Sequence, residues 1–186
     1  MEYLELLNKV EQWAKDRNLD TVEARTQYTK LTEEQGELGL AIDINNIDGD
    51  SGVKDSLGDY QVTLIIYCLI RGIDLKGKIE KQGDFWAVND DLEQFEKEHD
   101  VELFKVKDEF IYLTYQSSQM IGKYNRNKGV IEEHKHAIRI MEHLYQIAKK
   151  YNTTLEETLE MAYNEIKDRK GKMIDGVFVK EADLNE

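Results

Sequence analysis

The spacing of apolar residues predicts a chain built mainly of helices. In residues 2–17, Leu4, Leu7, Val10 and Trp13 recur at every third position and so form one stripe along a helix. The same kind of pattern, interrupted by polar or glycine-bearing stretches, predicts further helices over residues 22–45, 53–71, near 90–98, 101–126, 130–151 and 154–170. The predicted fold class is therefore all-α.

Two short polar stretches indicate where helices begin. Asp20 or Thr21 is expected to cap the second helix, and Thr153 or Thr154 the last long helix. Such side chains accept hydrogen bonds from the first backbone N–H groups of a helix, which have no partner within it.

Composition supports this helical interpretation. The chain of 186 residues contains no proline, whereas average usage of about 5% would give roughly nine. Because proline breaks helix interiors, its absence favours long helices joined by short connections. A short β-hairpin is expected near the C-terminus, where Asp175 and Gly176 separate two short apolar triplets. The length fits one domain over residues 1–186.

A weak internal similarity suggests two pseudo-repeat halves, about 1–84 and 100–186. Residues 31–42 can be overlaid on residues 113–124. The overlay pairs three glutamates with neutral residues: Glu33, Glu34 and Glu37 with Tyr115, Gln116 and Gln119, respectively. A real repeat would mean that the second half has lost every carboxylate of the first, although helical chains of similar composition also give such overlays by chance.

The net charge and the cysteine count limit the classes of partner that are expected and the compartment in which the protein is expected. The formal net charge of −13 argues against binding to polymeric nucleic acid or to an anionic membrane. The most apolar run, residues 62–70, is too short for a bilayer span, which needs about 20 residues. Cys68 is the single cysteine and cannot form an internal disulfide, and the N-terminus does not resemble a secretory signal. A cytoplasmic protein is therefore expected.

Five carboxylates stand at positions where helices usually face the core. In the stretch EEQGELGLAI, helical spacing places Glu33, Glu34 and Glu37 within about one third of the circumference, with Glu34 on the apolar stripe. On the next helix, Asp55 and Asp59 lie on the line of its core contacts. If the two helices are antiparallel, these side chains can meet at one place.

Such a group of carboxylates repels itself unless cations neutralise it. Hard oxygen ligands in this number suit Mg²⁺ or Mn²⁺, with coordination positions left for water and substrate phosphates. Gly36, Gly39 and Gly58, each about 1 kcal/mol worse than alanine in a helix, fit helices that approach closely around the group. The plainer alternative is that the carboxylates form the solvated edge of an apolar stripe, or favour a helix dipole in the case of Asp55.

Two segments carry a resemblance to a known family. They are Glu33-Glu34-Gln35-Gly36-Glu37 and, after a loop, Asp55-Ser56-Leu57-Gly58-Asp59 at the head of an apolar helix. In them the chain resembles the MazG-like all-α nucleotide pyrophosphohydrolases, a superfamily that includes the dimeric dUTPases and dCTPases. The stretch AYNEIKDRKGKMIDGVFVKEAD also resembles the C-terminal segment of phage-type members. The resemblance is strongest over about 22–72 and 155–183.

The resemblance implies an antiparallel helical bundle that hydrolyses a (deoxy)nucleoside triphosphate to the monophosphate and pyrophosphate with Mg²⁺. It implies Glu34, Glu37 and Asp59 as metal ligands, and Glu33 as a further ligand or as a base that orients water. Which carboxylate accepts the proton is left open.

The chain departs from the family pattern at one position. The second family motif is usually E-x-x-D, but position 56 is serine here. Asp55 stands one residue earlier and shares a helix face with Asp59, so it can replace the missing ligand. The number of bound metal ions is therefore open.

The C-terminal segment is expected to supply cations for the phosphates. Asn164, Lys167, Arg169 and Lys170 fall close together, and the family's corresponding segment contacts the nucleotide. Lysine and arginine both suit phosphate oxygens, arginine in a bidentate way. The alternative is an ordinary helix C-terminus, where the dipole favours cations.

Trp13, Tyr28 and Trp86 are the aromatic candidates for contact with a nucleobase, although each is more often a core residue. His134 and His136 lie two positions apart and point to nearly opposite sides of a helix, so surface or helix-end roles are expected for them.

The sequence thus favours a nucleotide pyrophosphohydrolase that forms a homodimer or homotetramer, because small helical units rarely bury every apolar face alone. The competing hypothesis is a non-catalytic helical binding or assembly module with a vestigial acidic site.

Overall fold

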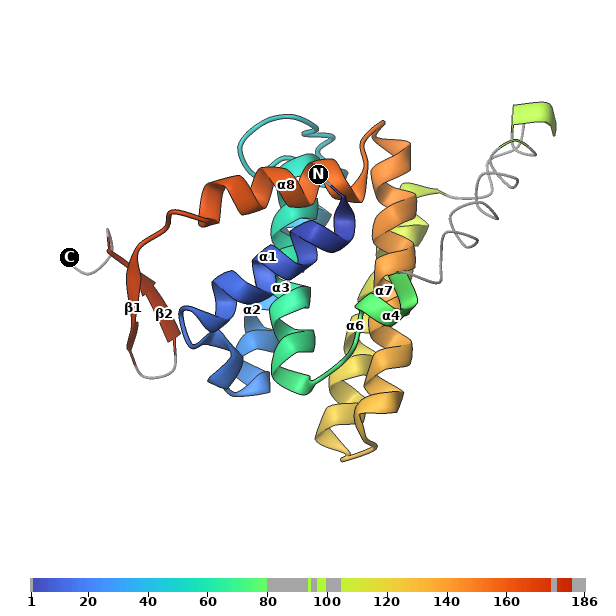
Figure 1. The fold of residues 1–186 in the computed structure, drawn as a ribbon. Coiled ribbons are helices and arrows are strands. Elements are labelled where there is room, and N and C mark those ends of the chain that lie inside the picture. Colours follow the sequence, from blue (N-terminus) through green and yellow to red (C-terminus); the bar gives the residue numbers. More distant parts are fainter. Residues whose placement is uncertain (1, 80–93, 95–96, 100–104, 175–176, 182–186) are drawn as a thin grey trace.

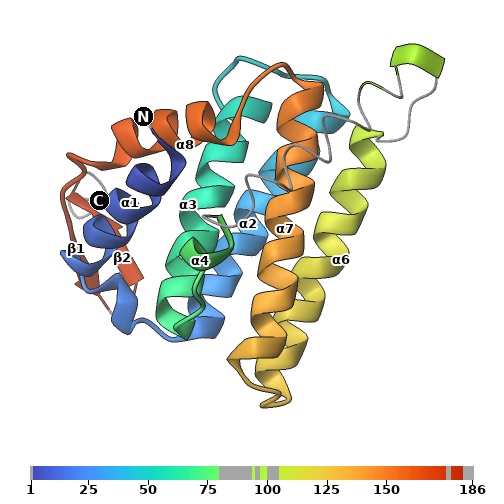
Figure 2. The ribbon, with the colours of Figure 1, turned by 45° about the vertical axis from the view of Figure 1, so that its right-hand side comes forward.

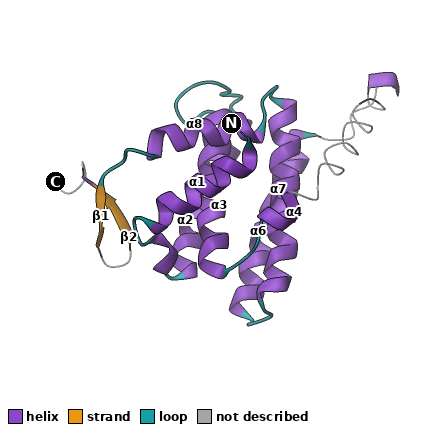
Figure 3. Ribbon diagram, in the orientation of Figure 1, coloured by secondary structure: helices purple, strands orange, loops and turns teal. Residues whose placement is uncertain are grey.

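The computed structural model describes residues 2–79, 94, 97–99, 105–174 and 177–181. The molecule is predominantly helical with one short hairpin (Figures 1 and 3), which confirms the all-α prediction at this level. The elements with defined bounds are α1 (Tyr3–Lys15), η1 (Leu19–Thr21), α2 (Ala24–Asp43), α3 (Val53–Arg71), α4 (Lys76–Ile79), α6 (Val106–Asn125), α7 (Val130–Lys150), α8 (Leu155–Ile166), β1 (Gly171–Ile174) and β2 (Val177–Lys180).

Helix α3 lies at the centre of the molecule. Of its 19 residues, 13 are buried, and it packs against α1, α2, α7 and α8. A helix that is apolar on nearly every side is stable only where other elements cover it and exclude water. This packing holds the start of the helix, which carries Asp55 and Asp59, in a fixed position.

The antiparallel pair α6–α7 lies beside the pair α2–α3 (Figure 2). Leu31 and Leu38 of α2 and Leu113 and Met120 of α6 are fully buried in the shared core. Each such side chain contributes roughly 1.5–3 kcal/mol by leaving water. The pseudo-repeat of the two pairs stays a prediction.

Glycines allow two close helix approaches, but neither surrounds the carboxylates. A Cβ on Gly58 would stand 2.4 Å from the Thr158 carbonyl oxygen of α8, and one on Gly39 would stand 2.6 Å from the Phe110 ring of α6. By contrast, a Cβ on Gly36 would have no described neighbour within 4 Å beyond its own stretch of helix. The predicted close approach around the carboxylates is therefore wrong: Gly58 allows α3 to approach α8, Gly39 allows α2 to approach α6, and Gly36 allows no such approach.

The two predicted helix starts differ in outcome. Asp20 and Thr21 lie in η1, where the Thr21 hydroxyl donates back to the preceding turn, and Glu23 is the residue before α2. The predicted cap there was therefore wrong. At α8, Thr154 and Glu157 form a reciprocal capping box, which confirms Thr154 as the N-cap.

The C-terminal hairpin is present, and the helix before it ends earlier than the helical pattern suggests. Helix α8 ends at Ile166 instead of continuing to residue 170, because the chain turns there toward β1. Strands β1 and β2 are antiparallel, with Gly171 opposite Lys180. Met173 and Phe178 pack against the helical core, and the hairpin lies beside α1 and α8 at one edge of the molecule (Figure 1).

Some sequence predictions fall outside the described residues. They concern Trp86, most of the short helix near 90–98 and the start of the helix expected from residue 101. Residues 94 and 97–99 are described and are helical. No helix in the described part of the chain has the length and apolar content needed to cross a membrane.

Candidate functional site

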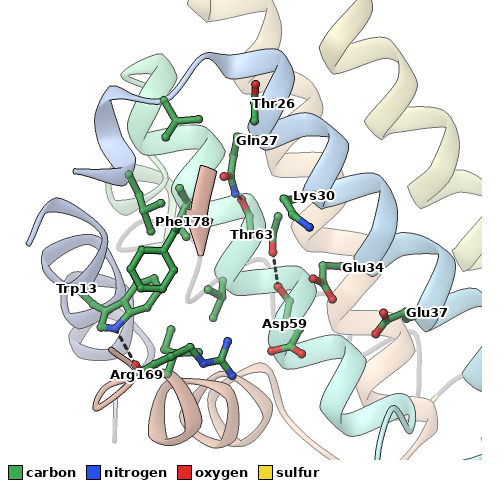
Figure 4. A pocket seen from close by; sticks show the side chains of 15 residues that line it. Trp13, Thr26, Gln27, Lys30, Glu34, Glu37, Asp59, Thr63, Arg169 and Phe178 are labelled. Carbon is green, nitrogen blue, oxygen red and sulfur yellow. Dashed lines mark hydrogen bonds between the residues drawn. The ribbon is translucent and has the colours of Figure 1, made fainter. Parts of the chain in front are cut away.

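A pocket of about 530 Å³ is enclosed by α1, η1, α2, α3 and the segment that leads from α8 into the hairpin. Its two ends differ in chemistry (Figure 4). One end carries charged side chains, namely Lys30, Glu34, Glu37, Asp59 and Arg169. The other end is aromatic and aliphatic. The pocket therefore suits an elongated ligand with a charged end and an apolar end.

The carboxylates at the charged end come from two helices. Glu34 and Glu37 are one turn apart on α2, and Asp59 lies on the neighbouring helix α3. Figure 4 shows all three at the same side of the pocket. The structure thus brings together three of the five carboxylates that helical spacing selected.

Glu34 has a strongly perturbed carboxyl group. Its pKa is raised to about 7, first by burial and then by the negative charges of Asp59 and Glu37. The ammonium of Lys30 acts in the opposite direction. Near neutral pH this side chain therefore holds its proton part of the time unless a cation is added.

Asp59 behaves in a similar way. Its pKa is raised to about 6 by burial and by the carboxylates of Asp55 and Glu165, while Arg169 lowers it. The pKa values of Glu34 and Asp59 are raised for the same reason. Both carboxylates are partly buried and lie close to other negative charges.

Glu33 and Asp55 lie outside the pocket wall. The Glu33 carboxylate is half exposed and pairs with Lys30 at 2.5 Å. Asp55 accepts a hydrogen bond of 3.0 Å from the backbone N–H of Ser51 and so closes the loop before α3. Asp55 acts on the pocket through its charge, because it raises the pKa of Asp59.

Ser56, at the position where the resembled motif usually has glutamate, is 1% exposed. Its hydroxyl has no hydrogen-bond partner among the described residues. This position of α3 is packed inside the protein and does not line the pocket, so a carboxylate there would need compensation that the present packing does not offer.

Only one of the four predicted C-terminal contacts lines the pocket. Arg169 does so, whereas Asn164 and Lys167 bond to each other at 2.9 Å on the exposed side. Lys170 is exposed at the start of the hairpin. The four were expected on one helical segment, and the end of α8 at Ile166 separates them.

No three His, Cys, Asp or Glu side chains form a ready metal-binding group in the described ranges. The donor chemistry of the pocket nevertheless fits a hard divalent cation, because Glu34, Glu37 and Asp59 offer carboxylate oxygens on one side of it. Burial and then mutual repulsion raise the pKa values of Glu34 and Asp59, and this repulsion opposes closer convergence of the carboxylates.

The apolar end is built around Trp13. This side chain is 8% exposed, and its indole N–H donates to the Ile166 carbonyl at 2.8 Å. Phe178 of β2 meets it edge-to-face, with ring centroids 6.2 Å apart. Leu19 and Val22 complete this end from the segment before α2.

The other aromatic candidates differ. The Tyr28 hydroxyl accepts a hydrogen bond of 3.3 Å from Ser117, and its ring packs edge-to-face on Tyr67, so Tyr28 is a core residue. Trp86 lies outside the described residues.

Sequence reasoning missed Lys30, Gln27 and Phe178. Lys30 precedes Glu34 by four residues and could have been found from the same helical spacing. Gln27 is buried and donates to the Thr63 carbonyl at 3.1 Å. No local pattern marks Phe178, because its role depends on how the hairpin folds back.

A second, shallower pocket of about 460 Å³ lies at α6 and α7. His134 and His136 line it and are half-buried, whereas the sequence predicted surface or helix-end positions for them. A ring nitrogen of His136 lies 2.8 Å from the Gln116 side-chain oxygen. Burial, then the charge of Lys123, lowers the pKa of His136.

Comparison with known proteins gives little further information. No protein-family profile and no solved structure matches the chain. The chain is similar to an uncharacterized 18.2 kDa protein from the rep-hol intergenic region of Haemophilus phage HP1 (strain HP1c1), with 39% identity over 71 residues. The similarity spans 38% of this chain and 42% of the phage protein.

Proposed function

We propose that this chain is a Mg²⁺-dependent MazG-like pyrophosphohydrolase that converts a (deoxy)nucleoside triphosphate to the monophosphate and pyrophosphate. The observation that carries the proposal is the two-ended pocket. Carboxylates and cations stand at one end, and Trp13 and Phe178 at the other. A nucleotide has the matching chemistry, with a polyphosphate at one end and a planar base at the other.

Glu34, Glu37 and Asp59 are the residues that would hold Mg²⁺, with Mn²⁺ as an alternative, and Asp55 would support them from outside the pocket. When bound, the cation would neutralise phosphate charge and lower the pKa of an attacking water. Glu33 is the candidate for orienting that water, from its place beside Lys30.

The cationic side chains bind and orient the phosphates in this proposal. Arg169 reaches the pocket from the segment after α8, and Lys30 from α2. An arginine fork can hold two phosphate oxygens at once, whereas lysine acts as a point charge. Asn164, Lys167 and Lys170 would contribute only at the rim.

The base would lie against Trp13, with Phe178 closing the far side. Burial of an aromatic face against a ring excludes water from this end and fixes the substrate's direction. The polar side chains of Thr26, Gln27 and Thr63 line the same pocket and are available to the base or the sugar.

A homodimer or homotetramer is part of the proposal. Leu40 on α2, Ile44 directly after it, and Ile111 and Tyr115 on α6 are large apolar residues that are 55–62% exposed. The two helices are neighbours, and exposed apolar patches are typical of interaction surfaces.

The decisive experiment is incubation with a panel of ribo- and deoxyribonucleoside triphosphates in the presence of Mg²⁺, with the phosphorus products identified. Pyrophosphate plus monophosphate is the expected result. Release of orthophosphate would indicate a different hydrolase.

The competing function is a non-catalytic helical module with a vestigial acidic site. Two observations favour it, namely Ser56 in the second motif and the absence of a ready metal-binding group among the described residues. Failure of every triphosphate to react, with the chain correctly folded, would support this alternative.

A further inference from the structure

We infer that Arg17 is a positioning residue that fixes the apolar end of the pocket relative to its charged end. This inference rests on the proposed function. Arg17 does not line the pocket, and no motif in the sequence marks it. Its contacts nevertheless join Trp13, at the apolar end, to Arg169, at the charged end.

The contacts with Arg169 are made through the backbone. The Arg17 Nη2 and Nε groups donate to the Arg169 carbonyl at 2.9 Å and 3.3 Å, and Nη2 also approaches the Lys167 carbonyl at 3.5 Å. These carbonyls follow the last turn of α8, where backbone acceptors lack partners within the helix. The Arg17 guanidinium therefore fixes the segment from which the Arg169 side chain projects.

The contact with Trp13 is made through its ring. The Arg17 guanidinium lies 4.6 Å from the Trp13 ring centroid, and Nη1 donates to the Trp13 carbonyl at 3.2 Å. The N–H group of the same indole donates to the Ile166 carbonyl. Trp13 and the end of α8 are thus tied together twice, once directly and once through Arg17.

Only arginine can make this set of contacts. Its planar fork donates in several directions in one plane and stacks on an aromatic face, whereas lysine is a compact point charge. Arg17→Lys keeps the charge and removes the geometry. Arg25→Lys is a matched control, since Arg25 also lies over a ring, that of Tyr124 at 5.8 Å, and bonds the Asn125 side chain at 3.1 Å, away from this pocket.

The first test measures how accessible Trp13 is to a quencher, in the absence of any substrate. Trp86→Phe leaves Trp13 as the single tryptophan of the full chain. In this background Arg17→Lys, and independently Arg17→Gln, should increase quenching of tryptophan fluorescence by acrylamide, while Arg25→Lys leaves it unchanged. Unchanged quenching in both Arg17 variants, at native helical content, would overturn the inference whether or not the protein is an enzyme.

The second test reads Arg169 through the proposed reaction. Arg17→Lys should raise KM for the preferred triphosphate about tenfold, the factor expected for one lost hydrogen-bonded contact, with kcat within about twofold. In an Arg169→Gln background the same change should raise KM by clearly less than tenfold, because only the contribution through Trp13 remains. Full additivity of the two changes would show that Arg17 does not act through Arg169. If the wild-type chain hydrolyses no triphosphate, the proposed function fails, and the fluorescence test alone decides on Arg17.

Discussion

The Arg71 guanidinium makes two hydrogen bonds to the Glu133 carboxylate, of 2.8 Å and 2.9 Å, although Glu133 is entirely buried. The Tyr67 hydroxyl donates to the same carboxylate at 3.1 Å, and Arg71 lies over the Tyr124 ring at 4.6 Å. The end of α3 is thereby fixed to the start of α7, which ties the site-bearing helices to the α6–α7 pair.

Arg71→Met should lower the free energy of unfolding by about 3 kcal/mol, because it leaves the buried Glu133 carboxylate without its counter-ion. Urea unfolding followed by circular dichroism measures the change. Adding Glu133→Leu should recover part of the loss, since the unpaired charge is removed. The control is Arg139→Met, which breaks a pair whose arginine is 61% exposed and should change stability by less than about 1 kcal/mol.

The metal-free protein should become less stable as the pH rises from about 4 to 7. The folded-state pKa values of Glu34 and Asp59 are raised to about 7 and about 6, so the folded state binds more protons than the unfolded state in this window. Their effect is absent below the unfolded pKa values and complete above pH 7. Allowing for partial exposure, Glu34 accounts for roughly 1–2 kcal/mol.

Glu34→Gln tests this directly in the presence of EDTA. The variant should match the wild type in urea midpoint at pH 4 and exceed it at pH 8. Glu5→Gln, at an exposed position on α1, serves as the control. A wild-type advantage at pH 8 would show that the Glu34 carboxylate is stabilised in the free protein.

Under the proposed function, Glu37→Gln should abolish turnover while leaving the helical content intact, because a metal ligand would contribute several kcal/mol to stabilising the transition state. The expected loss in kcat/KM is at least about 100-fold, measured as pyrophosphate release. Chelation by EDTA should stop the wild type, and Mg²⁺ should restore it. Glu5→Gln, which removes an exposed partner of Lys9, should keep full activity, and survival of activity in Glu37→Gln would refute the ligand assignment.

Two glycine-to-alanine changes should have opposite signs. Gly58→Ala should destabilise the protein by about 1–3 kcal/mol, because its methyl group would meet the Thr158 carbonyl oxygen at 2.4 Å. Gly36→Ala should stabilise it by up to about 1 kcal/mol, because helix propensity improves and no described atom beyond its own helix stretch stands within 4 Å. Thermal unfolding of the two variants gives the comparison. Equal effects would contradict the observed α3–α8 approach.

The acidic end of the pocket could be predicted because its geometry is local. Glu34 and Glu37 are one turn apart on α2, and Asp59 lies in the second turn of the next helix, so helical spacing and a short loop suffice to place them together. The same spacing could not distinguish Glu33 and Asp55, which lie at the margin. Their side chains are held by Lys30 and by the backbone of Ser51.

The apolar end could not be predicted because it depends on contacts between distant segments. Phe178 reaches Trp13 only because α8 ends at Ile166 and the hairpin folds back along α1. Helix propensity alone would have continued α8 through Lys167 and Arg169. The observed end of α8 coincides with a tertiary contact, namely the hydrogen bond from the Trp13 indole N–H to the Ile166 carbonyl.

The pairing of Trp13 with Phe178 has a consequence for synthesis on the ribosome. Domains form progressively as the chain emerges, so a nascent chain can assemble the α2–α3 carboxylates well before the strand that carries Phe178 has been translated. Prematurely terminated products that lack this strand would then expose an acidic surface without the facing ring. Under the proposed function, binding of a ligand across both ends of the pocket should therefore require synthesis of the strand that carries Phe178.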